Sequence, residues 1–343
     1  MVSLMLKKLE VFLSEKLGQT EEKQRLKMVI QAIAESVKQV AVMVEKAPLA
    51  GQLGKLENEN VQGEQQAKLD LLTNDCFVKN LQACEAVAGM VSEELEDAIV
   101  LSKDASMPNY LVVFDPLDGS SNIEVNVAVG SIFSVLKAPK NRAAQVADFL
   151  QKGIEQVLAG YAIYGPSTLL VFTFAEGVHI FTLDRDSDEF VLTQENMQVP
   201  ADTQEFAINA SNARFWELPI QQYISECQAG ITGARRKDFN MRWIASMVAD
   251  VHRILMRGGV YLYPKDSKLP LKAGRLRLLY ELNPMSWIIE QAGGKSSTGR
   301  ARVLEIVATD IHQRAPIIIG SNNEVERVVR YYQAFDQKFD KLN

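Results

Sequence analysis

The chain has 343 residues, of which 47% are hydrophobic and 23% charged, and its formal net charge is -6. This length accommodates one large or two ordinary domains, and the acidic balance argues against a nucleic-acid-binding surface. The three cysteines lack the paired spacing of a disulfide framework or a zinc site and indicate a reducing compartment. Because charges interrupt the apolar N-terminal stretch and no segment approaches about 18 apolar residues, we expect a cytoplasmic protein without a membrane span.

The first strong pattern along the chain is helical. Apolar residues recur at helical spacing from Leu26 to Val44, and Pro48 disfavours helix in the residue before it. A stretch rich in Gly, Asn, Gln and Glu follows at 51–66, which we expect to form a mobile loop. A second helical pattern begins near residue 67.

Short β-rich runs, separated by Gly, Pro and Asp, fill residues 86–195, and the close spacing of the last four predicts an antiparallel meander. Beyond residue 200, helices alternate with strands; a helical pattern over 241–257 ends in glycines, and Pro284 marks the first turn of another helix. We expect an α/β (α+β) layered protein with two mixed sheets and helices between and around them, divided into domains 1–200 and 201–343.

The stretch FDPLDGSSN (114–122) ends an apolar run with two acids, Asp115 and Asp118. Pro116 cannot donate a strand hydrogen bond, so we expect both carboxylates on a turn beyond the strand, where their oxygens converge. Carboxylates together with a backbone carbonyl such as that of Leu117 are the ligands that a hard cation such as Mg²⁺ requires.

The rest of this stretch suits an anion. Gly119 permits close approach of the backbone, and the amides and hydroxyls of Ser120 and Ser121 are able to bind phosphate oxygens. An isolated motif of this kind is more often an ordinary turn followed by a helix cap, so the interpretation depends on the other acids of the chain.

Two further apolar runs also end in acids. Glu93 and Glu94 follow one, and Glu281 follows the other. Each acid alone is better explained as a helix cap or a solvated surface charge. Three acid-bearing strand ends in one chain favour a shared metal site.

Basic residues lie close to these acids in the sequence. The alternation in GRLRLLYE places Arg275 and Arg277 on one strand face, and Arg277 precedes Glu281 by only four residues. A guanidinium group matches phosphate oxygens, whereas the run 235–237 is more simply a solvated strand face. Carboxylates for a metal and arginines for a phosphate together indicate metal-assisted hydrolysis of a phosphate ester.

These motifs resemble a known family. FDPLDGSSN, SMVADVHR, YLYP, GRLRLLYELNP, EQAGG and DIHQRAPIIIG stand in the order and approximate spacing of class I fructose-1,6-bisphosphatases, within the superfamily of Mg²⁺-dependent, lithium-sensitive sugar phosphatases. The resemblance implies a sugar-phosphatase-type layered sandwich and a homotetramer. It also implies a phosphoric monoester hydrolase that removes the 1-phosphate of D-fructose 1,6-bisphosphate in gluconeogenesis or carbon fixation, with a small sugar bisphosphate as its partner and neither nucleic acid nor membrane.

The resemblance implies roles for individual residues as well. The ligands of two or more Mg²⁺ per subunit, with Mn²⁺ as the alternative, would be Glu64, Glu93, Glu94, Asp115, the Leu117 carbonyl, Asp118 and Glu281. Asp70 would act with Glu94 to activate the attacking water. The reacting end of the substrate would contact Asp118, Gly119, Ser120, Ser121 and Arg277. Its far end would contact Asn209, Asn212, Tyr263, Arg275 and, from a neighbouring subunit, Arg242.

The sequence departs from the family pattern at positions that bear on substrate recognition and on regulation. Trp243 stands where animal enzymes have a tyrosine that hydrogen-bonds the 6-phosphate, and an indole NH can only donate. The segments that hold the phosphate of AMP in animal enzymes here carry Glu21, Glu22, Asn109 and Lys137. Because acids oppose an anion, we predict weak or absent inhibition by AMP.

Three other functions are compatible with the same pattern. The substrate could be sedoheptulose 1,7-bisphosphate, alone or together with the fructose compound. An inositol-phosphatase-like enzyme acting on monophosphates would not need the residues predicted to contact the far end of the substrate. A non-catalytic sugar-phosphate sensor typically lacks one of the catalytic acids, and here Asp70 and the predicted carboxylate ligands are all present.

Overall fold

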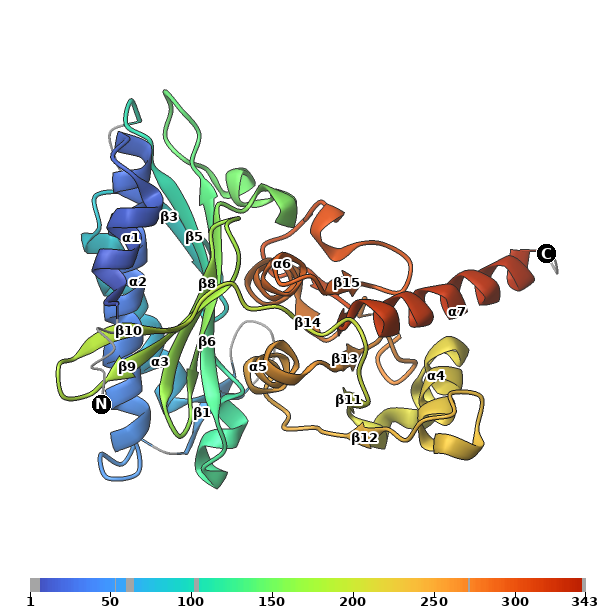
Figure 1. Ribbon diagram of the computed structural model, residues 1–343. Coiled ribbons are helices and arrows are strands. Elements are labelled where there is room, and N and C mark those ends of the chain that lie inside the picture. The colour runs from blue at the N-terminus through green and yellow to red at the C-terminus, as the bar shows by residue number, and fades with distance from the viewer. Residues whose placement is uncertain (1–6, 53, 60–64, 102–104, 271, 341–343) are drawn as a thin grey trace.

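The computed structural model describes residues 7–52, 54–59, 65–101, 105–270 and 272–340. Layers of helices alternate with two β-sheets (Figure 1). Helices cover the outer face of the larger sheet, lie between the two sheets, and cover the outer face of the smaller sheet (Figure 1). In that order they are α1 (Leu9–Leu17), α2 (Glu21–Lys46) and α3 (Lys68–Ala83), then α5 (Met247–Arg257) and α6 (Asn283–Gln291), then α4 (Leu218–Gln228) and α7 (Asn322–Asp340).

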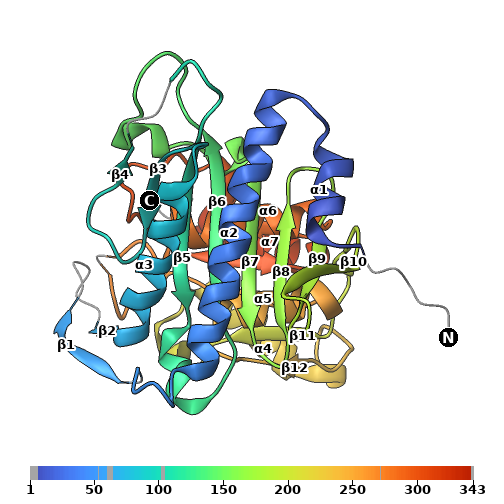
Figure 2. The same ribbon diagram turned by 90° about the vertical axis from the view of Figure 1, so that its left-hand side faces the viewer.

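The larger sheet has eight strands in the order β10-β9-β8-β7-β6-β5-β3-β4. Its pairs are antiparallel except for β3 with β5, which run parallel. The strands are β3 (Val87–Ser92), β4 (Ile99–Val100), β5 (Tyr110–Asp118), β6 (Val129–Lys137), β7 (Leu158–Tyr164), β8 (Thr168–Thr173), β9 (His179–Asp184) and β10 (Glu189–Gln194). Strands β7 to β10 form the predicted antiparallel meander, and α2 crosses the face of the sheet (Figure 2).

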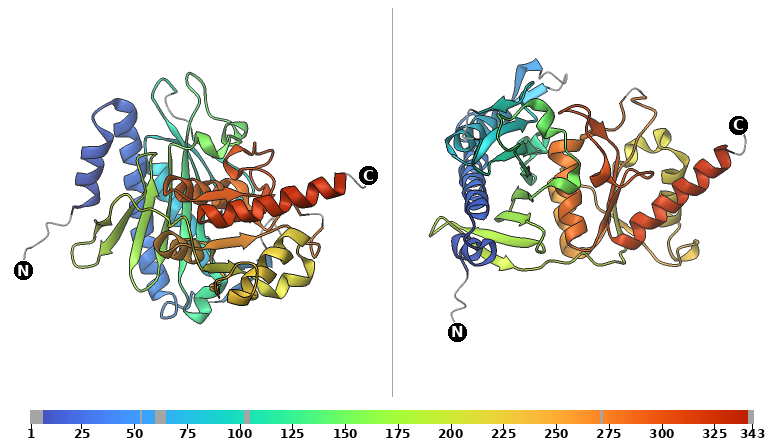
Figure 3. Two further views of the ribbon diagram at one scale, coloured as in Figure 1. Left: turned by 45° about the vertical axis from the view of Figure 1, so that its right-hand side comes forward. Right: turned by 90° about the horizontal axis from the view of Figure 1, so that it is seen from above.

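The smaller sheet has five strands in the order β12-β11-β13-β17-β15. They are β11 (Glu205–Ile208), β12 (Asn240–Met241), β13 (Val260–Tyr263), β15 (Lys295–Ser297) and β17 (Ile317–Gly320). Two short ribbons pair β1 (Lys55–Glu59) with β2 (Gln65–Ala67) and β14 (Leu276–Arg277) with β16 (Arg314–Ala315). Seen from above, the smaller sheet and its outer helices lie to one side of the larger sheet (Figure 3).

Buried apolar side chains form three clusters among the described residues, which correspond to the layers. One joins α1, α2 and α3 to the larger sheet through side chains such as Phe12 and Phe77. The second fills the space between the sheets around α5 and α6, and the third lies between the smaller sheet and α4 and α7. The layered α/β fold predicted from the sequence is confirmed.

The edge of the larger sheet at β10 is covered by the start of the described chain. Lys8 forms an antiparallel bridge with Val191, and the Leu192 amide donates to the Lys7 carbonyl at 2.8 Å. The ring of Phe12 in α1 then lies 4.7 Å from the ring of His179, which is fully buried in the meander.

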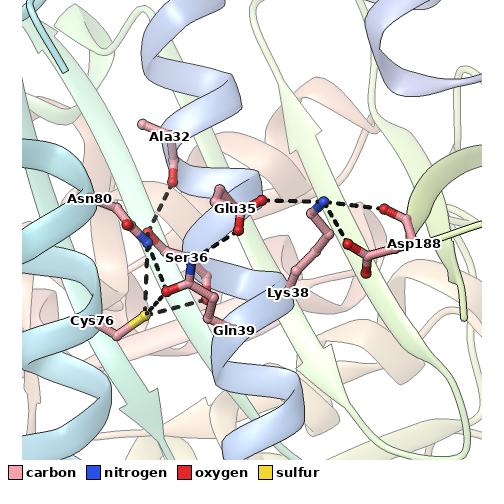
Figure 4. Close-up of polar contacts among 8 residues, drawn as sticks. All are labelled: Ala32, Glu35, Ser36, Lys38, Gln39, Cys76, Asn80 and Asp188. Atoms are coloured by element: carbon pink, nitrogen blue, oxygen red, sulfur yellow. Dashed lines mark hydrogen bonds and ion pairs between the residues drawn. The ribbon is translucent and has the colours of Figure 1, made fainter. Parts of the chain in front are cut away.

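A polar seam joins α2 to its neighbours on either side (Figure 4). Asn80 of α3 donates to the Ser36 hydroxyl at 3.1 Å and to the Gln39 side chain at 3.3 Å. On the other side, Lys38 forms an ion pair at 3.1 Å with Asp188, in the turn between β9 and β10. The contacts of Asn80 hold α3, whose first turn carries Asp70, against α2, and the ion pair of Lys38 joins α2 to the meander.

Three expectations about local structure are wrong. The stretch 51–66, predicted as a loop, contains β1 and the first two residues of β2, and these two strands pair with each other along one edge. The helix predicted from 241 begins only at Met247, because Ala245 has a positive φ of 68° and the Ser246 hydroxyl caps the Ala249 amide. Arg235, expected in solvent, has a side chain only 3% exposed and pairs with Glu324 at 2.5 Å.

Among the described residues, no helix is both long and apolar enough to cross a membrane.

Candidate active site

Strand β5 carries two of the predicted acids, and its shape corrects one expectation. The strand does not end at Pro116 but continues to Asp118, with Asp115 paired to Ile132 and Asp118 paired to Gly130. The register shifts between these pairs, so Pro116 lies in an irregular, bulged part of the strand where its missing N–H costs no ladder bond. This shift lets two carboxylates from one strand reach the same site.

Glu281 completes a cluster with these two acids. It lies in the π-helix η6 (Leu278–Leu282), and one carboxylate oxygen from each of Asp115, Asp118 and Glu281 lies within 4.8 Å of the others. All three residues are buried. A single π-helical turn of this kind is frequent at functional sites.

Burial raises the pKa of each of these carboxyl groups, and their mutual repulsion adds to the effect. Burial and the charge of Glu93 raise the pKa of Asp115 well above its ordinary value. The pKa of Asp118 rises to about 6 despite hydrogen bonds that oppose the shift, and that of Glu281 rises to about 8 although Arg277 lowers it. Three buried acids that repel one another are a donor set that a divalent cation fits, because the cation supplies the missing positive charge.

Arg277 and Glu93 lie at the edge of this cluster. The Arg277 guanidinium Nη1 is 2.7 Å from Glu93 Oε1 and 3.9 Å from Glu281 Oε2, while the Arg277 backbone amide donates to Glu281 Oε2 at 2.5 Å. Arg277 and Arg275 were predicted on one strand face, but they have different partners. The Arg275 guanidinium pairs with Asp266 at 3.0 Å.

Asp118 also connects β5 to the start of α5. One of its oxygens, Oδ2, accepts from the Ser246 hydroxyl at 2.8 Å and from the Val248 amide at 2.9 Å. The Asn122 side chain donates to the Ala245 carbonyl at 3.1 Å, and Asp250 accepts from the Ala245 amide at 3.2 Å. The turn before α5 is therefore fixed against the loop that follows Asp118.

That loop begins at Gly119, which has a left-handed backbone with φ 77° and ψ 25°. A Cβ atom at this position would lie 2.7 Å from the Ser246 Cβ, so the close approach requires glycine. Ser120 and Ser121 follow in the 3-10 helix η1 (Ser120–Val125).

The remaining predicted acids come from α3, from the end of β3 and from the stretch 51–66. Asp70 is buried in the first turn of α3, and Glu93 and Glu94 are half-buried just beyond β3. The Ser92 hydroxyl donates to Asn74 of α3 at 2.7 Å and thereby joins these two elements. Glu64 lies outside the described residues.

The residues predicted for the far end of a substrate come from the smaller sheet and its loops. Asn209 caps the 3-10 helix η4 (Ala210–Phe215), which contains the buried Asn212. Tyr263 ends β13, and the Arg275 guanidinium lies 5.9 Å from its ring. Arg242 is exposed, next to Trp243.

Sequence reasoning missed the residues that support the cluster, chiefly Ser246, Asp250 and Asn122. A signal was present, because a serine just before an apolar helical run is a typical N-cap. Starting the helix too early, at 241, concealed it.

The fold and this site define a layered α/β protein with a buried acidic centre suited to a divalent cation. Models of the fructose-1,6-bisphosphatase N-terminal and C-terminal domains match residues 7–195 and 199–333. The chain is 58% identical over 307 residues to a class 1 fructose-1,6-bisphosphatase of Acinetobacter baumannii, covering 90% of this chain and 94% of the relative. It is 55% identical to the class 1 fructose-1,6-bisphosphatase of Halorhodospira halophila, covering 88% and 90%.

A solved structure gives the same result. The crystal structure of Leishmania major fructose-1,6-bisphosphatase in holo form superposes with a TM-score of 0.88 at 36% identity, covering 96% of this chain and 99% of that one. The chain belongs to the fructose-1,6-bisphosphatase family.

Proposed function

We propose that this chain hydrolyses the 1-phosphate of D-fructose 1,6-bisphosphate to fructose 6-phosphate and phosphate, using Mg²⁺. The observation that carries the proposal is the convergence of three buried carboxylates beside Arg277 in a chain 58% identical to a class 1 fructose-1,6-bisphosphatase. Buried acids favour a cation and an adjacent guanidinium favours a phosphate, so the site suits a metal-bound phosphate ester.

In this proposal the cations would be held by the carboxylates of Asp115, Asp118 and Glu281, by Glu93 and Glu94, by the Leu117 carbonyl and by Glu64. When bound, divalent cations activate a water molecule and neutralise the oxygens of the transferring phosphoryl group. Two or more cations per subunit fit this number of donors, and Mn²⁺ would be an alternative to Mg²⁺.

The chain's own groups orient the substrate and move a proton. The amides after Gly119, the hydroxyls of Ser120 and Ser121 and the Arg277 guanidinium bind the 1-phosphate and stabilise its developing charge. Asp70, with Glu94, accepts the proton of the attacking water.

Selection of a bisphosphate falls to the far end of the site, where Asn209, Asn212, Tyr263, Arg275 and Arg242 bind the sugar and the 6-phosphate. The indole of Trp243 stacks on Tyr261 with ring centroids 5.6 Å apart and planes 7° apart, and a stacked indole contributes a flat wall and a single donor. We also propose a cytoplasmic homotetramer whose domains, 1–200 and 201–343, supply most of the metal-binding acids and most of the sugar-phosphate contacts, respectively.

Phosphate release by the purified protein tests the proposal. We expect release of one phosphate per fructose 1,6-bisphosphate, dependent on Mg²⁺, and little release from inositol monophosphate. Sedoheptulose 1,7-bisphosphate, assayed in parallel, determines whether the far end accepts a longer sugar. A folded protein that binds the bisphosphate but releases no phosphate would contradict the proposal and indicate a sensor.

A further inference from the structure

Two segments that bear acids of the site come from distant parts of the chain and meet at its edge. One is the loop 93–98, which follows β3 and carries Glu93 and Glu94; the other is η6, which carries Glu281. The ion pair between Glu93 and Arg277 connects the loop to the residue just before η6. A second connection is formed by His312, which no part of the proposed reaction uses.

The imidazole of His312 bridges the two segments directly. Its Nδ1 lies 2.9 Å from the hydroxyl of Tyr280, the residue that precedes Glu281 in η6. Its Nε2 lies 3.1 Å from the Glu96 carbonyl oxygen. A carbonyl can only accept, so Nε2 carries the proton and donates to Glu96. In the neutral ring Nδ1 is then an acceptor, and the Tyr280 hydroxyl donates to it.

The turn that presents His312 is itself fastened to the site. The His312 amide donates to the Asp310 carboxylate at 2.7 Å, and the Leu278 amide donates to the Gln313 carbonyl at 2.7 Å. The next residue, Arg314, pairs with Arg277 across β14 and β16. The imidazole is therefore anchored to the same element that presents the phosphate-binding arginine.

The two connections use different groups. The ion pair uses the Glu93 carboxylate and the Arg277 guanidinium, which a cation and a phosphate would each engage. The His312 bridge uses a backbone carbonyl and a phenol hydroxyl, neither of which belongs to the proposed ligand sets. A cation or a phosphate that separated Glu93 from Arg277 would therefore leave the His312 bridge in place.

We propose that His312 is a positioning residue that holds the loop 93–98 against η6 and thereby sets the affinity of the site for its divalent cation. This inference rests on the proposed function, because it takes Glu93 and Glu94 as cation ligands. Groups that orient metal ligands from outside the coordination shell typically change metal affinity by roughly 10- to 100-fold when they are removed.

Three variants separate the bridge from the general stability of the turn. His312→Phe keeps an aromatic ring but removes both hydrogen bonds. His312→Gln keeps a donor at the position of Nε2, so it retains the contact with Glu96. Thr309→Val is the matched control, because it removes an exposed hydroxyl that contacts Gln313 at 3.0 Å in the same turn and leaves Glu96 and Tyr280 untouched.

The test measures Mn²⁺ binding by calorimetry without substrate, together with hydrogen exchange of the amides of residues 93–97 in the metal-free protein. We expect about tenfold weaker Mn²⁺ binding and faster exchange in His312→Phe, substantial rescue in His312→Gln, and wild-type behaviour in Thr309→Val. In assays of the enzyme, the metal concentration for half-maximal activity should rise more than kcat falls. Unchanged Mn²⁺ binding in His312→Phe would overturn the proposal, as would equal losses in His312→Phe and Thr309→Val.

Neither binding nor exchange requires turnover, so this inference and the proposed function can fail separately. A wild-type protein that binds Mn²⁺ tightly and releases no phosphate contradicts the proposed function alone. A wild-type protein that hydrolyses the bisphosphate, with a His312→Phe variant of normal Mn²⁺ affinity, contradicts this inference alone.

Discussion

Arg277 and Glu93 form an ion pair at 2.7 Å although their side chains are only 7% and 12% exposed. The guanidinium is thus a positive charge that partly offsets the negative charge of the acidic cluster when no metal cation is bound. This arrangement links the stability of the protein to its ligands.

The first prediction concerns this balance. Replacing Arg277 with Met removes the guanidinium charge from beside the buried acids. We therefore expect the metal-free protein to lose about 3 kcal/mol of unfolding free energy. Added Mg²⁺ should recover much of this loss, because it supplies the missing charge, while activity stays low. Urea unfolding in EDTA and in Mg²⁺ measures both effects. Equal losses in the two conditions would show that the pair does not act through the cluster.

The second prediction concerns pH. Glu281 and Asp118 have raised pKa values of about 8 and about 6, so the folded metal-free protein holds protons that the unfolded chain releases. Their contribution to stability is therefore fully present at low pH, below the unfolded pKa values, and it is lost as pH rises through about 6 and about 8. Thermal unfolding in EDTA from pH 5 to 8.5 should show this decline.

The same shifts predict a pH dependence of cation binding. Since bound cations favour ionised carboxylates, the rise in Tm caused by Mg²⁺ should grow with pH over this range. An increment independent of pH would contradict the protonation of the cluster.

The third prediction tests the site assignment. Asp118→Asn should preserve the fold, because the amide oxygen can still accept from Ser246 and Val248, and should lower kcat by more than about 100-fold through loss of a proposed metal ligand. The circular dichroism spectrum and Tm report the fold, and phosphate release reports the activity. Asp188→Asn, which alters an exposed carboxylate, is the control. Near-normal turnover of Asp118→Asn would refute the assignment.

The fourth prediction isolates the contact between Gly119 and Ser246. Gly119→Ala meets both a positive φ and a 2.7 Å approach to the Ser246 Cβ, whereas Gly18→Ala meets a positive φ of 72° with nothing within 4 Å. Each should lose about 1–3 kcal/mol of unfolding free energy from backbone strain. Only Gly119→Ala should also lose most of its activity, because its loop must move. Comparable activity in the two variants would show that the contact is not needed.

The fifth prediction concerns AMP. Lys137, which stands where the resemblance implies a phosphate-binding arginine, forms an ion pair at 2.7 Å with Glu22. The hydrogen bond from this lysine lowers the pKa of Glu22 and favours the negatively charged carboxylate beside Lys137. We expect weak or absent inhibition in an AMP titration of bisphosphate hydrolysis. Strong inhibition at metabolic concentrations would contradict it.

The sequence predicted the layers and the meeting of Asp115, Asp118 and Glu281 better than the local geometry that joins them. The acids could be found because apolar runs that end in carboxylates carry a clear pattern, as at Asp115 and Asp118. The bulge at Pro116, the bridge through His312 and the buried pair of Arg235 with Glu324 could not, since each depends on which distant segments meet. The start of α5 was predicted too early because the apolar spacing continues on the N-terminal side of Ser246. Only the turn formed by Ala245 and Ser246 shows where the helix begins.

The covered edge at β10 has a practical consequence for handling the protein. An uncovered strand edge offers unpaired backbone groups to other molecules and favours aggregation. Here Lys7 and Lys8 pair with that edge, and α1 packs beside it. Proteolysis or a tag that displaces this short segment would leave the residues of the site in place but make the preparation prone to precipitate. The integrity of the N-terminal segment should therefore be checked before a loss of activity is attributed to the site.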